Sequence, residues 1–201
     1  MAEQFRINVL SVEYPGYGLL DECSKSESGI YLVAQTVLRF LVDVMQVRYE
    51  HIVLMGRSIG SGPACFLASR FPVGGLLLVC PFFSLRHAVH SVAGRFISAF
   101  FRERFDNSVA MRNVKCPTLF IHGAKDRLLP AEHSLELFHQ CRAERKKLHV
   151  CEHMEHNSHL FVDGDFFAVP CISFFGFPGY STGRSVSIPD EYLASNFVSV
   201  N

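Results

Sequence analysis

Apolar residues along the chain follow two patterns, short continuous runs and longer stretches at helical spacing. The run from Val73 to Cys80 is almost entirely apolar, which is typical of a strand buried on both faces of a parallel sheet. Between Ser28 and Val47 the apolar residues fall three and four positions apart, which predicts an amphipathic helix. The same patterns predict strands at Arg6–Tyr14, His51–Met55, Thr118–His122 and Lys147–Cys151, and helices at Ser61–Phe71 and Pro130–Cys141.

The alternation of these strands and helices predicts an α/β fold, with a mostly parallel sheet and right-handed crossovers. Phe82 to Met111 is longer and irregular, and we interpret it as an excursion from the sheet. After Phe167 the composition changes to Gly, Pro, Ser and aromatic residues without a helical period. We therefore expect one core over residues 1–167, with a lid-like excursion at 82–112, followed by a tail at 168–201.

Composition narrows the class of protein without identifying it. An apolar fraction of 49% and a charged fraction of 19% in 201 residues are typical of a globular domain. Lys and Arg (19) balance Asp and Glu (19), which gives no reason to expect nucleic acid as a partner. The polar first residues lack the apolar region of a signal peptide, and no run of about 18 apolar residues occurs, so we expect a soluble, cytoplasmic protein.

The seven cysteines are scattered and form no C-x-x-C pair. This spacing predicts neither a zinc site nor a disulfide framework. We expect most of them to be small buried residues in a reducing compartment.

A candidate nucleophile lies in the segment Gly56-Arg57-Ser58-Ile59-Gly60. The pattern Gly-x-Ser-x-Gly alone is weak, since a chain of this length contains it by chance about one time in fifteen. Here it follows a predicted strand and precedes a predicted helix, a strand-turn-helix arrangement that exposes a nucleophilic serine. We expect the two glycines to leave room for the neighbouring chain, and the Ile59 N–H to bind an oxyanion. The alternative is a glycine turn with an incidental serine.

A serine needs a base, and the base needs an orienting acid, in the chain order Ser, acid, His for this fold. Asp126 follows the strand Thr118–His122, although a turn aspartate bonding its own backbone is an alternative. Three histidines follow the last strand, His153, His156 and His159. Spacing favours His156, which lies in the middle of the loop, and leaves the other two open.

With these residues in place, the chain resembles a known group from about Asn8 to Phe161, roughly three quarters of its length. The group is the α/β-hydrolase domain-containing 17 depalmitoylases and their close relatives. The matching segments are Glu13-Tyr14-Pro15-Gly16-Tyr17-Gly18, Gly56-Arg57-Ser58-Ile59-Gly60-Ser61-Gly62, Ala68-Ser69-Arg70, Cys116-Pro117-Thr118-Leu119-Phe120-Ile121-His122-Gly123 with Asp126, and His156-Asn157.

The resemblance implies a triad of Ser58, Asp126 and His156 that cleaves acyl esters or thioesters, with protein depalmitoylation as the specific case. An acylated protein or a small ester would be the substrate, and no cofactor or metal is implied. Similar proteins begin with about three more strands and a His-Gly-Asn type loop that supplies a second oxyanion donor, for which this chain has no counterpart. We therefore expect an α/β-hydrolase fold that lacks its first strands. The alternative is a catalytically impaired, hydrolase-like interaction protein or a truncated isoform.

Residues 82–105 combine aromatic and basic side chains. Such a segment can line an acyl-chain pocket or contact a membrane surface peripherally. It can also be a lid helix packed with its apolar side toward the core. Oligomeric state is not indicated by any pattern in the sequence.

Overall fold

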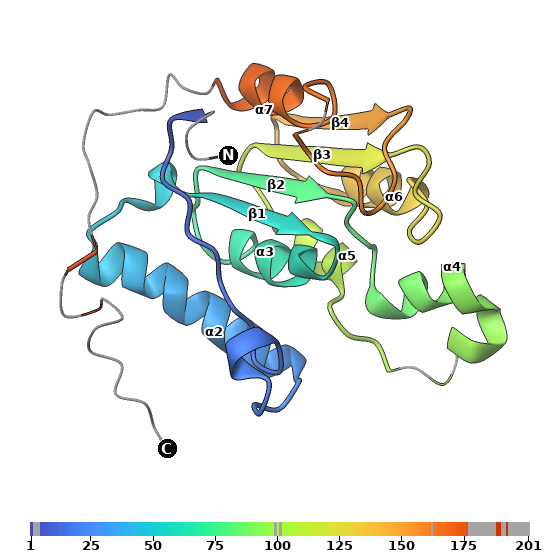
Figure 1. Cartoon of the computed structure of the whole chain (residues 1–201), viewed down its shortest axis with the longest axis horizontal. Helices are drawn as coiled ribbons and strands as arrows, with labels where there is room; N and C mark the ends of the chain where they lie inside the picture. The colour runs from blue at the N-terminus through green and yellow to red at the C-terminus, as the bar shows by residue number, and fades with distance from the viewer. Residues whose placement is uncertain are drawn as a thin grey trace.

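The computed structural model describes residue 1 and residues 5–98, 100, 102–161, 163–176, 188–189 and 192, with the backbone alone at 95 and 96. Its centre is a four-stranded, fully parallel sheet in the order β1-β2-β3-β4 (Figure 1). The strands are β1 (Val53–Arg57), β2 (Gly75–Val79), β3 (Thr118–Gly123) and β4 (Lys146–Cys151). Four predicted strands are thus confirmed to within about two residues at their ends.

Helices connect the strands and cover both faces of the sheet. The α-helices are α2 (Glu27–Arg39), α3 (Ser61–Ala68), α4 (Leu85–Ser98), α5 (Asn107–Met111), α6 (Glu132–Gln140) and α7 (Ala168–Phe175), and a π-helical turn (Phe40–Val44) extends α2. Short 3-10 turns occupy Gly18–Leu20, Tyr49–His51 and Ser58–Gly60. Among the described residues, no helix is both long and apolar enough to cross a membrane.

The two faces of the sheet have separate apolar cores. On one face Leu76, Leu78 and Phe120 pack against side chains from α2, α3, α5 and α6. On the other face Leu119 and Ile121 pack against Phe5 and the aromatic side chains around α7, which lies above the sheet in Figure 1. The strand residues of β2 and β3 are buried throughout, as expected for strands covered on both sides.

The predicted strand at Arg6–Tyr14 is wrong. The structure has no strand among residues 5–14, and Val9 and Leu10 are 48% and 47% exposed. A sequence rich in Val and Ile becomes a strand only where a neighbouring strand accepts its hydrogen bonds and another layer covers its side chains. Here neither condition holds, so the segment is irregular.

The segment after Phe167 also differs from the expectation, because it forms α7. Phe167, Cys171 and Phe175 are buried at a spacing of four residues and pack on the sheet. Pro170 lies in the first turn, where a missing N–H costs no helical hydrogen bond. The remainder of the expected tail lies almost entirely outside the described residues, and the division of the chain at residue 167 stays a prediction.

The predicted excursion between β2 and β3 contains α4 and α5. In Figure 1 α4 projects beyond the carboxyl ends of the strands, where functional side chains of a parallel sheet gather. Its helical path is broken at Gly94, whose φ of 83° and ψ of 170° suit glycine alone.

Candidate active site

Ser58 occupies a sharp turn between β1 and α3. Its φ of 50° lies in the left-handed region, which is strained for a residue with a side chain. Such strain is common where a structure must present a reactive group. A Cβ on Gly56 would lie 2.5 Å from the carbonyl oxygen of Gly60, so the turn requires glycine there.

The expectation that Gly60 is needed for space is wrong. Its φ is −64°, and a Cβ added there would meet only the Tyr14 hydroxyl, at 3.8 Å. That distance is an ordinary van der Waals contact. The tight approach in this turn therefore depends on Gly56.

Asp126 follows β3, and its carboxylate has no exposed surface. One oxygen, Oδ1, accepts hydrogen bonds from the N–H groups of Leu128 (3.0 Å) and Leu129 (2.7 Å). The other oxygen, Oδ2, lies 2.7 Å from His156 Nδ1 and 3.4 Å from His122 Nε2. The alternative of a turn aspartate is therefore half right, because one oxygen caps its own loop while the other faces two histidines.

These contacts govern the charge of Asp126. Burial alone would raise the pKa of this carboxyl, but the close His122 ring and the hydrogen bonds from His156 and the Leu129 N–H outweigh burial and hold the pKa below its ordinary value. Asp126 is therefore an anion at neutral pH.

His156 lies between Asp126 and Ser58. Its Nδ1 is 2.7 Å from Asp126 Oδ2, and its Nε2 is 3.0 Å from Ser58 Oγ. Because the carboxylate can only accept, Nδ1–H donates to Asp126 and Nε2 is left to accept from the serine hydroxyl. His153 and His159 are exposed, and neither contacts these groups in the described structure. Of the three candidate histidines, the structure brings His156 to Ser58.

His122 is a fully buried residue of the site that the sequence did not single out. Its Nε2–H donates to the Leu129 carbonyl (2.8 Å), which leaves Nδ1 to accept from the Ser134 hydroxyl (2.6 Å). His122 therefore fixes the loop that carries Asp126 to the start of α6. The feature of the sequence that could have identified His122 is its position near the end of β3, in a run of buried residues.

Cys80 is a second residue that was missed. It follows β2 with a φ of 44°, and burial raises the pKa of its thiol to about 12. Its sulfur, a carboxylate oxygen of Asp126 and a ring nitrogen of His156 all lie within 4.8 Å of one another, as metal ligands could. A metal ion would need the thiolate form of Cys80, which burial disfavours. It would also need the His156 nitrogen and the Asp126 oxygen as ligands, but these two atoms are already hydrogen-bonded to each other. The arrangement therefore fits a hydrogen-bonded triad better than a metal site.

Residues 21–161 match the serine hydrolase (FSH1) family. The chain belongs to this family. Relatives include Protein bem46 of Schizosaccharomyces pombe (31% identical over 166 residues), alpha/beta hydrolase domain-containing protein 17B of Xenopus laevis (28% over 151) and "Uncharacterized membrane protein YNL320W" of Saccharomyces cerevisiae (30% over 168). These matches cover 75–80% of this chain but 51–58% of the relatives, so it spans about half the length of the curated relatives it matches.

Solved structures confirm the predicted α/β-hydrolase fold. Acetyl xylan esterase 1 from Thermoanaerobacterium matches with a TM-score of 0.58 at 18% identity, over 73% of this chain and 51% of the esterase. The putative non-heme bromoperoxidase BpoC from Mycobacterium tuberculosis matches with a TM-score of 0.59 at 14% identity, over 84% and 80% of the two chains. At these identities the likeness concerns the fold.

In this FSH1-family chain a hollow of about 320 Å³ opens beside Ile59, the residue after Ser58. Its other walls come from the segment before α2 and are Ser11, Val12, Glu13, Tyr14 and Tyr17. Partial burial raises the pKa of the Tyr14 phenol. The volume lies at the lower end of the range for small-molecule sites, and the hollow is open at its mouth.

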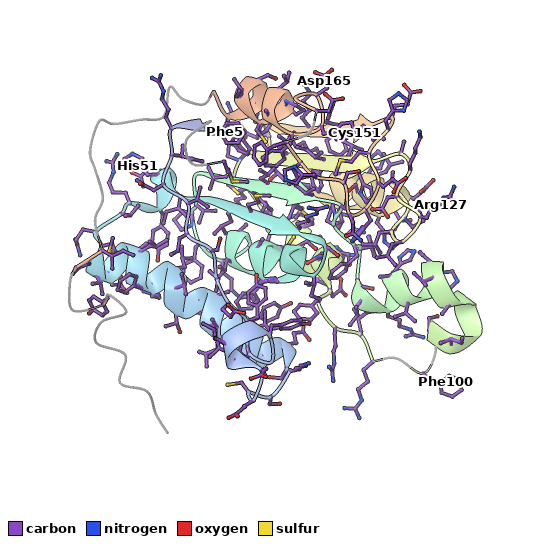
Figure 2. The ribbon with its side chains drawn as sticks, viewed as in Figure 1. Phe5, His51, Phe100, Arg127, Cys151 and Asp165 are labelled. Carbon is purple, nitrogen blue, oxygen red and sulfur yellow. The ribbon has the colours of Figure 1, made fainter. Side chains whose placement is uncertain are left out.

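The segment 82–105 divides into a packed part and an exposed part. Phe82, Ala88 and Phe105 are buried in a cluster with Ile30, while Ile59 packs at its border. Val92, Ile97 and Phe100 are instead 60%, 50% and 90% exposed, and Figure 2 shows Phe100 at the outer edge of the molecule, away from the sheet. The lid interpretation thus fits the packed part, whereas Phe101 and the side chains of Arg95 and Phe96 lie outside the described residues.

Proposed function

We propose that this protein is a serine esterase or thioesterase that works through an acyl-Ser58 intermediate. The observation that carries the proposal is the continuous line of contacts from Ser58 Oγ through His156 to the buried Asp126 carboxylate, at 3.0 and 2.7 Å. Both distances are within the range of working hydrogen bonds between a nucleophile, its base and an orienting acid.

In the first half of the reaction, Ser58 Oγ attacks the acyl carbon while its proton passes to His156 Nε2. The C–O or C–S bond to the leaving group then breaks, and His156 returns that proton to the alcohol or thiol. In the second half a water attacks the acyl-serine and His156 accepts a proton from this water. His156 then gives that proton to Ser58 Oγ as the bond between Oγ and the acyl carbon breaks, and the carboxylic acid leaves. The Asp126 anion holds the Nδ1–H tautomer and stabilises the imidazolium that forms twice.

The negative charge on the acyl oxygen needs a donor, and we assign this role to the Ile59 N–H. Ile59 lies in the first turn after β1, where backbone N–H groups have no partner within the helix. The dipole of the turn and of α3 behind it favours an anion at this end. One such donor is typically worth about 2.7–4 kcal/mol of transition-state stabilisation, so loss of the Ile59 N–H is expected to slow turnover by about a hundred- to a thousandfold.

The hollow beside Ile59 supports a carbonyl substrate that enters next to Ser58. Its walls include one valine, one isoleucine and two tyrosine rings, which favour an acyl chain over a charged group. A thioester of a fatty acid with a protein, such as palmitoyl-cysteine, is the specific substrate that the resemblance implies. An S-acyl peptide series from acetyl to palmitoyl would test this choice, and a rate that falls steadily with chain length would count against it.

A fluorophosphonate probe tests the proposal directly, since it modifies an activated serine. We expect labelling of the wild-type chain and none of Ser58→Ala. Ser69→Ala is the matched control, because this hydroxyl bonds the Phe66 carbonyl and Arg70 at the carboxyl end of α3. A folded wild-type chain that takes no label would refute the enzymatic proposal. It would favour the alternative of an impaired, hydrolase-like interaction protein.

The exposed apolar residues of the excursion support peripheral membrane contact as a further part of the proposal. Val92, Ile97 and Phe100 are exposed, and the basic residues Arg102 and Arg104 follow Phe100 in the sequence. Apolar side chains insert into the headgroup region while basic groups attract anionic lipids. Co-flotation with phosphatidylserine vesicles should be lost in Phe100→Ser, and unchanged flotation of this variant would exclude the contact.

A further inference from the structure

Arg57, the residue before the nucleophile, reaches across the site to the loop that carries the base. Its Nη2 donates to the backbone carbonyls of His156 (2.6 Å) and Ser158 (3.0 Å), about a hundred positions away in the chain. The guanidinium therefore joins the turn of Ser58 to the backbone of His156 itself. None of the proposed reaction steps uses this contact.

The topology explains why such a contact is needed. His156 follows β4, at one edge of the sheet, whereas Ser58 follows β1 at the other edge. Neighbouring strands lie about 4.8 Å apart, so the loop after β4 must carry the imidazole across about 14 Å. A loop of this reach has many conformations unless both of its ends are held.

The near end of the loop is held by β3. Lys125 N–H donates to the Met154 carbonyl (3.1 Å), and a Cβ on Gly123 would collide with the backbone of Met154. The far end is held by Arg57. Side chains alternate between the two faces along a strand, so Arg57 lies on the same face of β1 as Val53, four residues earlier. Val53 packs in the same core as Met154, and this face is therefore the one that the loop after β4 crosses.

We propose that Arg57 is a positioning residue that fixes the distance between His156 Nε2 and Ser58 Oγ. It touches neither the substrate nor the reacting atoms, and it acts through the backbone of the base. This inference rests on the proposed function, because it concerns the rate at which Ser58 reacts. A displacement of about 1 Å in a reacting group can cost a hundredfold in rate, which sets the scale of the expected effect.

The test uses Arg57→Met, which keeps an apolar stem of similar path and removes both donors, and Arg57→Lys, which keeps the charge on a shorter stem. Arg48→Met is the matched control, since Arg48 is exposed and, within the described part of the chain, its side chain pairs with Glu50 and His51. The measurements are the rate of fluorophosphonate labelling and kcat and KM for a small p-nitrophenyl ester. Circular dichroism checks the fold of each variant.

We expect labelling and kcat to fall about a hundredfold in Arg57→Met, with KM within about twofold of wild type. Arg57→Lys should recover part of this loss, and Arg48→Met should behave as wild type. A folded Arg57→Met with wild-type kcat would overturn the inference, as would a loss that appears in KM alone. If Arg57→Met does not fold, the rate of Arg57→Lys tests the inference instead. A wild-type rate in Arg57→Lys refutes the positioning role, and a loss of tenfold or more supports it.

The outcome separates this inference from the proposed function. A wild-type chain that fails to label refutes the proposed function itself. A wild-type chain that labels, together with an Arg57→Met variant that labels equally fast, refutes only the role of Arg57.

Discussion

His133 of α6 gives the stability of this protein a defined dependence on pH. Its side chain is 3% exposed, its Nδ1 accepts the Phe83 N–H at 3.2 Å, and its Nε2 faces the Ser91 hydroxyl at 3.0 Å. Burial, followed by the charges of His87 and His122, lowers the pKa of His133 to about 4, against a smaller opposite effect of Asp126. The neutral ring therefore fastens the start of the excursion and α4 to α6.

The sign of the effect follows from where protons bind. Between about pH 6.5 and 4 the unfolded chain protonates His133 and the folded chain does not, so the free energy of unfolding falls as the pH falls through this window. Each tenfold difference in proton affinity is worth about 1.4 kcal/mol, which gives an upper value of about 3 kcal/mol for the whole window. The lowered pKa of Asp126 acts in a separate window, below about pH 4.

The assay is urea denaturation at pH 7.5, 6, 5 and 4.5 for wild type, His133→Gln and His139→Gln. A glutamine side chain at this position is neutral at every pH, so the difference between wild type and His133→Gln isolates the titration of the imidazole. His139 lies exposed on the same helix and serves as the matched control. We expect wild type and His139→Gln to lose about 2 kcal/mol more than His133→Gln across this range. Parallel pH profiles for wild type and His133→Gln would refute the reasoning.

Three further predictions concern the triad, the core and the thiols. Asp126→Asn should lower kcat by about four orders of magnitude with the fold intact, because an amide N–H facing Nδ1 imposes the wrong tautomer on His156. Activity within tenfold of wild type would contradict this. Phe120→Ala, at a side chain with no exposed surface, should lower the free energy of unfolding in urea by about 3–5 kcal/mol, and a loss under about 1 kcal/mol would contradict the packing argument. Iodoacetamide at pH 8 should modify exposed Cys23 long before Cys80, because a pKa of about 12 keeps the Cys80 side chain in its thiol form. Equal rates of modification in peptide mapping would contradict the burial of Cys80.

Much of the fold was predictable because a strand that is buried on both faces appears in the sequence as an unbroken run of apolar residues. The runs at Val73–Cys80 and Thr118–His122 became the two central strands, which are covered on both faces. The amino-terminal segment was less predictable. Arg6–Tyr14 has the composition of a strand, but strand formation depends on a partner and a covering layer, and neither can be inferred from the segment itself.

The helix α7 was missed although a signal existed. Phe167, Cys171 and Phe175 are spaced as one face of a helix, and all three are buried. Pro170 and the surrounding aromatic residues obscured this period. The reason is physical, since proline breaks a helix in its interior and is tolerated in its first turn.

The site was predictable where chain order and strand ends determine it. Ser58 directly follows β1 and Asp126 lies in the loop after β3, and parallel strands bring their carboxyl ends to one edge of the sheet. The base was harder to choose, because three histidines share one loop and the choice depends on how that loop crosses the sheet. That crossing is governed by Arg57 and Gly123, whose contacts with the loop cannot be read from the loop's own sequence.

The members of the triad are held in place in two different ways. Ser58 and Asp126 are fixed by strands with short connections, so their positions depend on local structure. His156 is fixed by contacts between residues about 30 and 100 positions apart, Asp126 on one side and Arg57 on the other. Because long-range contacts of a loop are lost before the central strands of a sheet, mild denaturant should abolish serine labelling before it unfolds the core. Of the three members of the proposed triad, His156 is therefore the one that we expect denaturant to displace first.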